Sequence, residues 1–333
     1  MNHPLRNLKA TANPYIRRRT YRTVLYSTGA LKRDLTSTAY HRKSPDSRIS
    51  DIGRTIKDDY ATLRDKYQTP RNPIVLAHGL LGFDELRLVG KLLPGVHYWR
   101  GITEALKANG TEVILTSVPP SASIEERAVK LSEDIERKAG GKSVNIIAHS
   151  MGGLDARYMI SQLKPPNVKV RSLTTIASPH RGSAFADYCF ESIGEHRLPK
   201  IYSTLRALEI ETGAFSQLTR RYMMEEFNPK TPDREGVTYF SYGAMATPPL
   251  WSAFRQSHRI VEQEEGPNDG LVSVASSQWG TYKGTLEDVS HLDLINWTNR
   301  LRWLAWEVLG NKRNFNAIAF YLDIADMLAK EGY

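Results

Sequence analysis

Apolar and polar positions alternate along the chain in two periods, beginning just after Pro70. Short apolar runs of strand length are followed by longer stretches in which apolar residues recur every three or four positions, as on one face of a helix. This order of strands and helices favours an α/β fold with a mostly parallel central sheet that helices cover on both faces. Strands are predicted at 74–77, 112–118, 143–148, 172–177, 236–243 and 271–276, and helices at 99–108, 123–138, 150–163, 293–309 and 315–330.

Local signals sharpen some of these boundaries and place two further segments. Ser123 and Glu126 form an S-x-x-E capping box, so the second helix is predicted to begin there. The polar segment 44–68 carries apolar residues at helical spacing, and one helix is expected within 52–63. Residues 184–235 hold helical patches with little strand character, which predicts a helical, lid-like insertion over the sheet.

The net charge of +9 is concentrated near the amino-terminal end. Residues 1–46 contain ten Lys or Arg against Asp34 and Asp46, which accounts for eight of the nine net charges. The segment includes the basic run 17–19 among tyrosines and hydroxyl residues, a composition typical of a mitochondrial presequence. The alternative is a disordered basic arm that touches nucleic acid or anionic lipid, but no nucleic-acid-binding motif accompanies it. We therefore expect a presequence-like or disordered segment at 1–46, a mitochondrial location with the lipid droplet or cytoplasm as alternatives, and no nucleic-acid partner.

Size and composition restrict the classes of protein to which the chain can belong. A chain of 333 residues is long enough for one large domain, expected over 47–333, and 41% hydrophobic with 24% charged residues is ordinary for a globular protein. No apolar run reaches the roughly 18 residues of a membrane-spanning helix. The single cysteine, Cys189, cannot form an intramolecular disulfide or a cysteine metal cage. We expect no cofactor.

The stretch IIAHSMGGLDARY, residues 146–158, has the pattern of a nucleophile elbow. The apolar period changes from strand to helix at Ser150, which would place this serine on a tight turn with its Oγ exposed. The pattern departs from G-x-S-x-G because Ala148 stands at the first glycine, while Gly152 and Gly153 permit close approach of the backbone. On this motif alone, a small residue in an ordinary turn remains the alternative.

A second motif, IVLAHGLLGFD at 74–84, predicts a strand that ends in a flexible loop. Such a loop can offer a backbone N–H as one half of an oxyanion hole, and the helix start after the nucleophile offers the other. The expected donors are the N–H groups of Leu80 and Met151. The expected supporting residues are His78, as a hydrogen-bonded loop histidine, with Gly79, Gly82 and Gly152.

A serine nucleophile needs a base, and the base needs an acid that orients it. In α/β-hydrolases the chain order is Ser, then Asp or Glu, then His, so the histidine lies late in the sequence. His291 is the last of nine histidines, whereas the other late one, His258, lies in a basic stretch without loop chemistry. Asp269, flanked by turn residues in GPNDGLVS, is the expected acid. We predict a triad of Ser150, Asp269 and His291.

Two other histidines flank the predicted site. His149 occupies the variable position of the elbow, where local packing or hydrogen bonding is expected. His180, in ASPHRGS, is expected to brace the site rather than to transfer protons.

Seven motifs in order link the chain to a known family: NPIVLAHGLLGFD, SIEERA, NIIAHSMGGLDARY, SLTTIASPHRGS, YFSYG, PNDGLVSVASSQWG and HLDLINW. With them, the chain resembles the mitochondrial triacylglycerol lipases of yeasts and, more distantly, the bacterial true lipases, from about Asn72 to the carboxyl end. The resemblance implies an α/β-hydrolase fold, triacylglycerol lipase activity, and a triad that matches Ser150, Asp269 and His291.

One feature departs from the bacterial pattern. Those lipases hold a structural Ca²⁺ with an aspartate two residues after the catalytic histidine, which Asp293 matches, and with another aspartate after the SYG-like strand. The corresponding region here, AMATPPLWSAF at 244–254, contains no acid. We therefore expect no metal, and Asp293 to be a helix-capping residue.

The predicted function is serine-dependent hydrolysis of carboxylic esters, with release of fatty acids from acylglycerols through an acyl-enzyme. The expected partners are the lipid substrate and a peripheral lipid surface or membrane. A phospholipase, thioesterase or acyltransferase would use the same parts, and a catalytically silent lipid-binding protein could retain the fold.

Overall fold

The computed structural model describes residues 52–80, 98–193, 212–249, 252, 254–297 and 315–333. The chain divides into two units, Met1–Ser44 and Pro45–Tyr333, and the description below concerns the second unit alone. The predicted boundaries of the leading segment and of the lid stay predictions. Among the described helices, none is both long and apolar enough to cross a bilayer.

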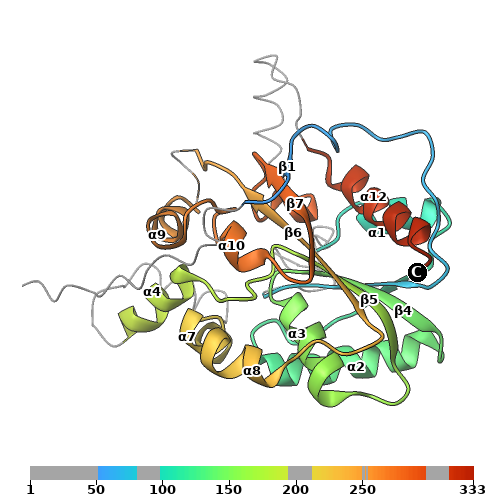
Figure 1. Ribbon diagram of the computed structural model, residues 1–333, viewed down its shortest axis with the longest axis horizontal. Helices are drawn as coiled ribbons and strands as arrows, with labels where there is room; N and C mark the ends of the chain where they lie inside the picture. Colours follow the sequence, from blue (N-terminus) through green and yellow to red (C-terminus); the bar gives the residue numbers. More distant parts are fainter. Residues whose placement is uncertain (1–51, 81–97, 194–211, 250–251, 253, 298–314) are drawn as a thin grey trace, which may run out of the picture. The chain divides into compact units, whose positions relative to one another are not determined.

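Within the described part of the chain, seven parallel strands form one sheet in the order β1-β7-β6-β5-β4-β2-β3 (Figure 1). Side chains of β2 alternate between its faces: Ile74 and Leu76 join one apolar cluster, and Val75 and Ala77 join another. The predicted parallel sheet is confirmed. The strands are β1 (Thr55–Ile56), β2 (Ile74–Ala77), β3 (Val113–Leu115), β4 (Ser143–His149), β5 (Lys169–Ile176), β6 (Thr238–Met245) and β7 (Thr281–Glu287).

Helices cover both faces of this sheet, as the pattern predicts. On one face, α1 (Ile102–Ala108) and α12 (Ala317–Lys330) bury apolar residues such as Leu106 and Phe320. On the other lie α2 (Ile124–Ala139), α3 (Gly152–Tyr158) and the π-helix η2 (Met159–Leu163), with buried residues such as Leu131 (Figure 1). Burying a leucine or phenylalanine side chain contributes roughly 1.5–3 kcal/mol, so these faces hold the layers together.

The predicted start of α2 is confirmed in detail. Ser123 Oγ accepts a hydrogen bond from the Glu126 amide at 3.3 Å, and the Glu126 carboxylate accepts one from the Ser123 amide at 3.1 Å. Gly140, in the left-handed region, ends the helix.

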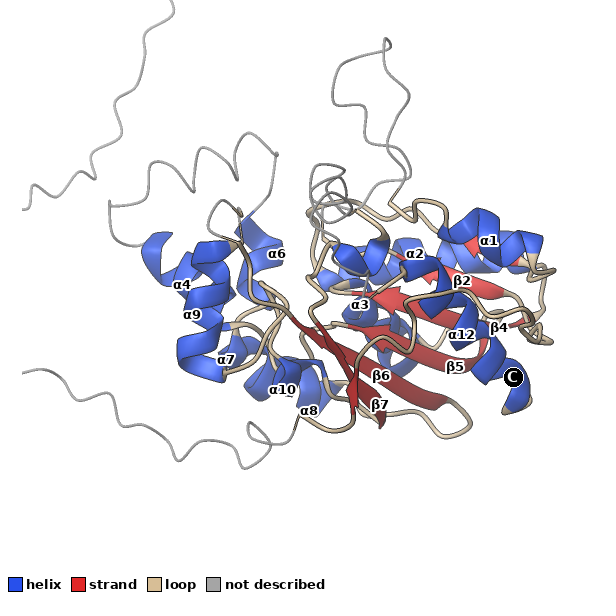
Figure 2. Ribbon diagram, turned by 90° about the horizontal axis from the view of Figure 1, so that it is seen from above, coloured by secondary structure: helices blue, strands red, loops and turns tan. Residues whose placement is uncertain are grey.

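Shorter helices form a group beside the sheet (Figure 2). A small apolar cluster joins residues of this group, including Leu218 and Phe227, to Met151 and Leu154 at the start of α3. Arg220 bonds the Asp187 carboxylate, which ties two of these helices together. The group consists of α4 (Ala184–Ile193), α6 (Thr212–Gln217), α7 (Arg220–Tyr222), the π-helix η3 (Met223–Phe227), α8 (Asn228–Lys230) and α9 (Arg255–Glu265).

Three predicted elements are wrong or incomplete. No helix is described within 52–63; instead β1 pairs with β7, and Gly53 and Asp58 have left-handed backbones that a helix cannot contain. Residues 271–276 are not a strand, because Ser273 caps the short helix α10 (Val274–Ser277) and the strand follows at β7. The helix expected from Asp293 begins as the 3₁₀-helix η4 (Asp293–Ile295), which ends at left-handed Asn296, and 298–314 lies outside the described residues.

Candidate active site

Ser150 lies on a strained turn between β4 and α3. Its φ of 55° is in the left-handed region, which costs a non-glycine residue on the order of 1 kcal/mol or more. Two hydrogen bonds hold the turn: the Ser150 amide donates to the Ile176 carbonyl at 2.9 Å, and the Ser178 hydroxyl donates to the Ser150 carbonyl at 2.7 Å. Both partners come from β5 and the loop after it. These two hydrogen bonds therefore hold Ser150 in its strained conformation and keep it at the carboxyl end of the sheet.

Two glycines let the elbow contact the end of β2. A Cβ at Gly152 would lie 2.6 Å from the Ala77 carbonyl oxygen, and a Cβ at Gly79 would lie 2.7 Å from the Cβ of Ser150. Neither position has room for a side chain without a shift of the backbone. The loop after β2 and the start of α3 consequently lie against each other.

The expected oxyanion donors, Leu80 and Met151, occupy these two segments. Among the described residues, neither amide donates a hydrogen bond to a protein acceptor. Backbone N–H groups on both segments beside the serine are the arrangement that a developing oxyanion requires. Gly82, expected to support the same loop, lies outside the described residues.

His78 holds the turn between β2 and this loop. Its Nδ1 lies 3.0 Å from the Gly79 carbonyl oxygen and its Nε2 accepts a hydrogen bond from the Val118 amide at 3.2 Å. Burial, with the positive charge of Arg127, lowers the pKa of His78 to about 4. A neutral ring with a proton on Nδ1 satisfies both contacts. The geometry agrees with the supporting role that the sequence predicts.

Asp269 and His291 meet in a buried pair. His291 Nδ1 lies 2.6 Å from Asp269 Oδ2, and the His291 amide donates to the Asp269 carbonyl at 3.0 Å. The other carboxylate oxygen accepts hydrogen bonds from the amides of Leu271 and Val272 at 3.0 and 2.9 Å. These contacts fix the carboxylate, which in turn orients the imidazole so that Nε2 is the nitrogen left for chemistry.

The pair lies next to the elbow through His149. The ring of His149, the residue before Ser150, has its centroid 4.5 Å from that of His291. Burial, with the nearby His291, holds the pKa of His149 well below its usual value, so this ring is neutral. The structure thus joins His291 to Asp269 and places this pair against His149, the residue before Ser150.

Tyr98 is a site residue that the sequence reasoning missed. Its hydroxyl accepts a hydrogen bond from the Gly79 amide at 3.0 Å and lies 2.7 Å from His149 Nδ1. One hydroxyl therefore connects the oxyanion loop with the elbow. No motif around Tyr98 signals this contact, because its partners are distant in the sequence.

Arg127 was also missed. Its guanidinium is wholly buried and donates to Asp155 on α3 at 2.9 Å, to the His78 carbonyl at 2.9 Å and to the Pro119 carbonyl at 2.8 Å. Burial raises the pKa of Asp155 to about 6 while the Arg127 charge opposes the rise. The pair links α2, α3 and the end of β2 below the predicted oxyanion hole.

His180 braces the far end of α3 through Arg157. His180 Nδ1 lies 3.2 Å from Arg157 Nη1, and its Nε2 lies 2.9 Å from the Thr175 hydroxyl. Trp279 contacts both groups, with the Arg157 guanidinium 3.5 Å from its ring centroid. Burial, with the charges of Arg157 and Arg181, holds the pKa of His180 well below its usual value. This neutral histidine contacts no member of the predicted triad directly.

Asp293 has a local role in the loop that carries His291. Its carboxylate accepts hydrogen bonds from the Ser290 amide at 3.0 Å and the Ser290 hydroxyl at 2.6 Å. It thus closes the turn before η4. The predicted capping role is wrong, because Leu292 is the N-cap of η4 and no side chain caps this helix. Among the described residues, no group of three or more His, Cys, Asp or Glu side chains is arranged to hold a metal ion.

Solved structures identify the class to which this arrangement belongs. The mature lipase BlEst2 of Bacillus licheniformis superposes with a TM-score of 0.56 at 20% identity, over 75% of this chain and 96% of that one. The fold is therefore the α/β-hydrolase fold.

Sequence comparison gives the family. The chain is 38% identical to triacylglycerol lipase 2 of Saccharomyces cerevisiae, over 83% of this chain and 96% of that protein. It is 27% identical to a triacylglycerol lipase of Pseudomonas fragi, over 79% and 97%. A family model described as palmitoyl protein thioesterase matches residues 73–227. The chain belongs to the triacylglycerol lipase family.

Proposed function

We propose that this protein hydrolyses acylglycerols, with triacylglycerol as its principal substrate, and that Ser150, Asp269 and His291 are its catalytic triad. The observation that carries the proposal is the buried His291–Asp269 hydrogen bond beside the strained Ser150 turn. Membership of the triacylglycerol lipase family supports an ester as the bond that is cleaved and a lipid as the substrate.

In the proposed reaction, Ser150 Oγ attacks the ester carbonyl carbon and passes its proton to His291 Nε2. The amides of Leu80 and Met151 donate hydrogen bonds to the carbonyl oxygen as it becomes negative. His291 then protonates the alcohol oxygen of the departing glyceride, which leaves the acyl group on Ser150. A water molecule, deprotonated by the same histidine, releases the fatty acid and restores the serine. The Asp269 carboxylate stabilises the imidazolium in both steps.

A thioesterase is the second candidate, because the family model that matches residues 73–227 is described by that activity. Both reactions use the same triad, so the leaving group must be tested directly. Purified protein is incubated with trioctanoylglycerol, a phosphatidylcholine and octanoyl-CoA, and fatty acid release is measured. We expect the glyceride to be cleaved at the highest kcat/KM. A higher value for the thioester would replace the proposal with the second candidate.

The chemistry itself is tested with a fluorophosphonate probe, which reacts with activated serines. We expect wild-type protein to be labelled and Ser150→Ala to be unlabelled. Absence of labelling in the wild type, with circular dichroism showing a folded protein, would leave a silent lipid-binding protein as the better description.

We also propose that the helical group around α4 contacts a lipid surface. Phe190 on α4 and Met224 on η3 are 51% and 47% exposed, and both belong to this group of helices. Such residues can enter the boundary between headgroups and acyl chains. Higher activity on emulsified than on monomeric ester, reduced in Phe190→Ser/Met224→Ser, is the expected result. Equal rates on both substrates would argue against this contact.

The location in the cell is proposed from the leading basic segment alone. Residues 1–46, with their eight excess positive charges, are proposed to direct the protein to the mitochondrion. Fusion of this segment to a fluorescent protein tests the proposal. Reporter signal on lipid droplets or throughout the cytoplasm would support one of the alternatives instead.

A further inference from the structure

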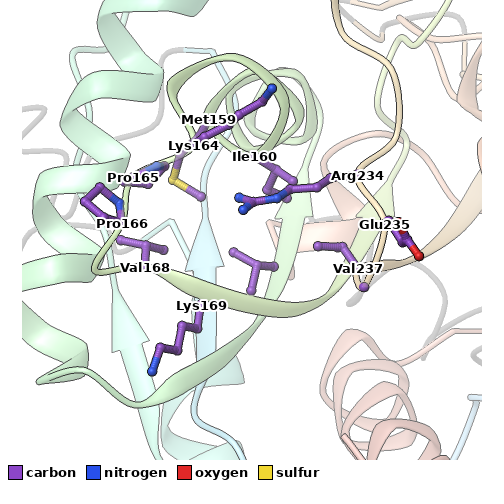
Figure 3. Close-up of a pocket in the computed structure, with 12 residues that line it drawn as sticks. Met159, Ile160, Lys164, Pro165, Pro166, Val168, Lys169, Arg234, Glu235 and Val237 are labelled. Carbon is purple, nitrogen blue, oxygen red and sulfur yellow. The ribbon is translucent and has the colours of Figure 1, made fainter.

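A pocket of about 230 Å³ lies where β5 and β6 begin, at the opposite end of the sheet from Ser150 (Figure 3). Arg234 extends inward among its lining residues, whereas apolar residues such as Met159 and Ile160 are buried in the core. No apolar floor is therefore open to an acyl chain. The residues that can act on the proposed reaction lie at the carboxyl end of the sheet, around His149.

His149 is the last residue of β4, and its side chain is wholly buried. Side chains alternate along a strand, so His149 shares a face with Ile147, which belongs to the apolar cluster that contains residues of α1 and α12. The proposed reaction uses neither nitrogen of His149. The residue nevertheless adjoins Ser150 in the sequence, and its ring adjoins that of His291 in space.

The two nitrogens of His149 have different surroundings. The Tyr98 hydroxyl lies 2.7 Å from Nδ1 and donates to it, because the ring is neutral and the hydroxyl already accepts from the Gly79 amide. The ring proton is therefore on Nε2, which is buried and makes no hydrogen bond of ordinary geometry with a described residue. Burial lowers the pKa of the ring most, followed by the charge of His291, and the backbone of His291 acts in the opposite sense. The Nε2 side of the ring consequently lies toward the loop that carries His291.

Tyr98 also holds the chain that follows His291. Trp297 Nε1, six residues after His291, donates to the Tyr98 carbonyl at 3.2 Å. The contacts form a closed circuit, from the Tyr98 hydroxyl to His149, from His149 to the His291 ring, and along the chain back to the Tyr98 carbonyl. Within this circuit, His149 is the residue that contacts the imidazole itself.

The hydrogen bond to Asp269 leaves the His291 imidazole one freedom. It fixes the Nδ1 edge at 2.6 Å, but a ring that is held at one edge can still tilt about that bond. The centroid of the His149 ring is 4.5 Å from that of His291, with the two planes 46° apart, which is within the range of direct ring contact. Because the His149 ring is neutral, it adds no positive charge beside the imidazolium that would form on His291.

We propose that His149 is a positioning residue, whose ring limits the tilt of His291 so that Nε2 stays directed at the Ser150 Oγ and then at the leaving oxygen. The proposal rests on the proposed function, because that function makes His291 the base. A misplacement of about 1 Å can lower a rate by about a hundredfold, so the contact has a measurable effect. The position before the nucleophile then requires a ring that is aromatic, neutral and able to accept the Tyr98 proton.

Two substitutions separate the ring contact from the bond to Tyr98. His149→Asn can present Oδ1 to the Tyr98 hydroxyl, near the place of Nδ1, but it has no ring to contact His291. His149→Phe keeps a ring but cannot accept the Tyr98 proton. His180→Asn is the matched control, since His180 is a buried neutral histidine with hydrogen-bond partners outside the proposed triad. Circular dichroism shows that each variant is folded.

Kinetics on two soluble esters of the same acyl chain give the first readout. A p-nitrophenolate departs without a proton, whereas the oxygen of a methyl ester must be protonated by His291 as it leaves. In His149→Asn we expect kcat on the methyl ester to fall by roughly tenfold to a hundredfold, and by less on the p-nitrophenyl ester, with little change in KM. His149→Phe should lower both rates equally, because loss of the Tyr98 bond acts through the oxyanion loop. His180→Asn should leave the ratio of the two rates unchanged.

Proton NMR gives a readout that needs no activity. In the wild type, the Nδ1 proton that His291 shares with Asp269 should give a far-downfield resonance, which persists in His149→Phe and broadens by solvent exchange in His149→Asn. If the wild type neither hydrolyses the esters nor reacts with the fluorophosphonate, the proposed function fails, and this resonance alone decides the positioning. Equal losses on both esters in His149→Asn, a resonance unchanged in that variant, one lost equally in His149→Phe, or none in the wild type would overturn the proposal.

Discussion

The Tyr98 hydroxyl lies 2.7 Å from Nδ1 of His149, the residue that precedes the proposed nucleophile. The same hydroxyl accepts a hydrogen bond from the Gly79 amide at 3.0 Å, one residue before Leu80. Because the His149 ring is neutral, its Nδ1 can accept the hydroxyl proton. A single side chain therefore fixes the distance between the two backbone segments that are proposed to stabilise the oxyanion.

The first prediction concerns Tyr98→Phe. The variant leaves the Gly79 amide and His149 Nδ1 without this partner, which should cost about 1–3 kcal/mol of unfolding free energy. Without this link the oxyanion loop would no longer be held at a fixed distance from the elbow. We therefore expect kcat on a soluble p-nitrophenyl ester to fall by roughly tenfold with little change in KM. The control is Tyr321→Phe, which removes a buried hydroxyl that has no hydrogen-bond partner among the described residues. Similar losses in both variants would show that Tyr98 acts through packing alone.

The second prediction concerns the acid of the triad. Asp269→Asn removes the charge that orients and stabilises the His291 imidazolium, and kcat should fall by about 10³ to 10⁴. Steady-state kinetics and the rate of fluorophosphonate labelling measure the loss. Asp288→Asn, three residues before His291, should change kcat by less than about threefold because the His291 Nδ1 already pairs with Asp269. A larger effect at Asp288 would reverse the assignment.

The parts of the site that could be predicted carry their signals in neighbouring residues. Ser150 stands where the apolar period changes, Ser123 and Glu126 are three residues apart, and Asp269 and His291 follow the chain order of a triad. Tyr98 and Arg127 carry no such signal, since their partners are brought to them only by the fold.

The wrong elements have a related cause. Apolar spacing in residues 52–63 favours a helix. In the structure, β1 pairs with β7 within this segment, and the left-handed residues Gly53 and Asp58 on either side of β1 keep the strand short. In 271–276 the branched apolar residues favour a strand, but Ser273 accepts a hydrogen bond from the Ser276 amide and begins a helix. Tertiary pairing and local capping outweigh a weak strand or helix period over so few residues.

The third prediction tests the buried pair of Arg127 and Asp155. Arg127→Met leaves a buried carboxylate without its counter-charge and should destabilise the fold by about 3–5 kcal/mol in urea unfolding at pH 8. Without the arginine, the raised pKa of Asp155 should rise further. A carboxyl group whose pKa is higher in the folded than in the unfolded state destabilises the fold only as the pH rises and ionises it. Relative to the wild type, the variant should therefore lose less stability at pH 5.5 than at pH 8.

A second substitution separates the pair from simple packing. Arg127→Met/Asp155→Leu replaces both charges with apolar groups and should recover most of the loss. Additive losses in the double variant would mean that the two side chains act independently.

The last prediction concerns acid sensitivity. His78 has a folded-state pKa of about 4, against an ordinary value of 6.5, because it is buried near Arg127. The unfolded chain therefore binds this proton first, so the stabilising contribution is complete above pH 6.5 and is lost as the pH falls toward 4, by about 3 kcal/mol in total. Protonation would also set an N–H on Nε2 against the Val118 amide that now donates to it.

His78→Gln keeps an acceptor for that amide but does not titrate, and urea unfolding between pH 7.5 and pH 4.5 should show a smaller loss than in the wild type. Some loss should persist, because His149 and His180 have pKa values lowered in the same direction. Parallel curves for the two proteins would assign the acid sensitivity to groups other than His78.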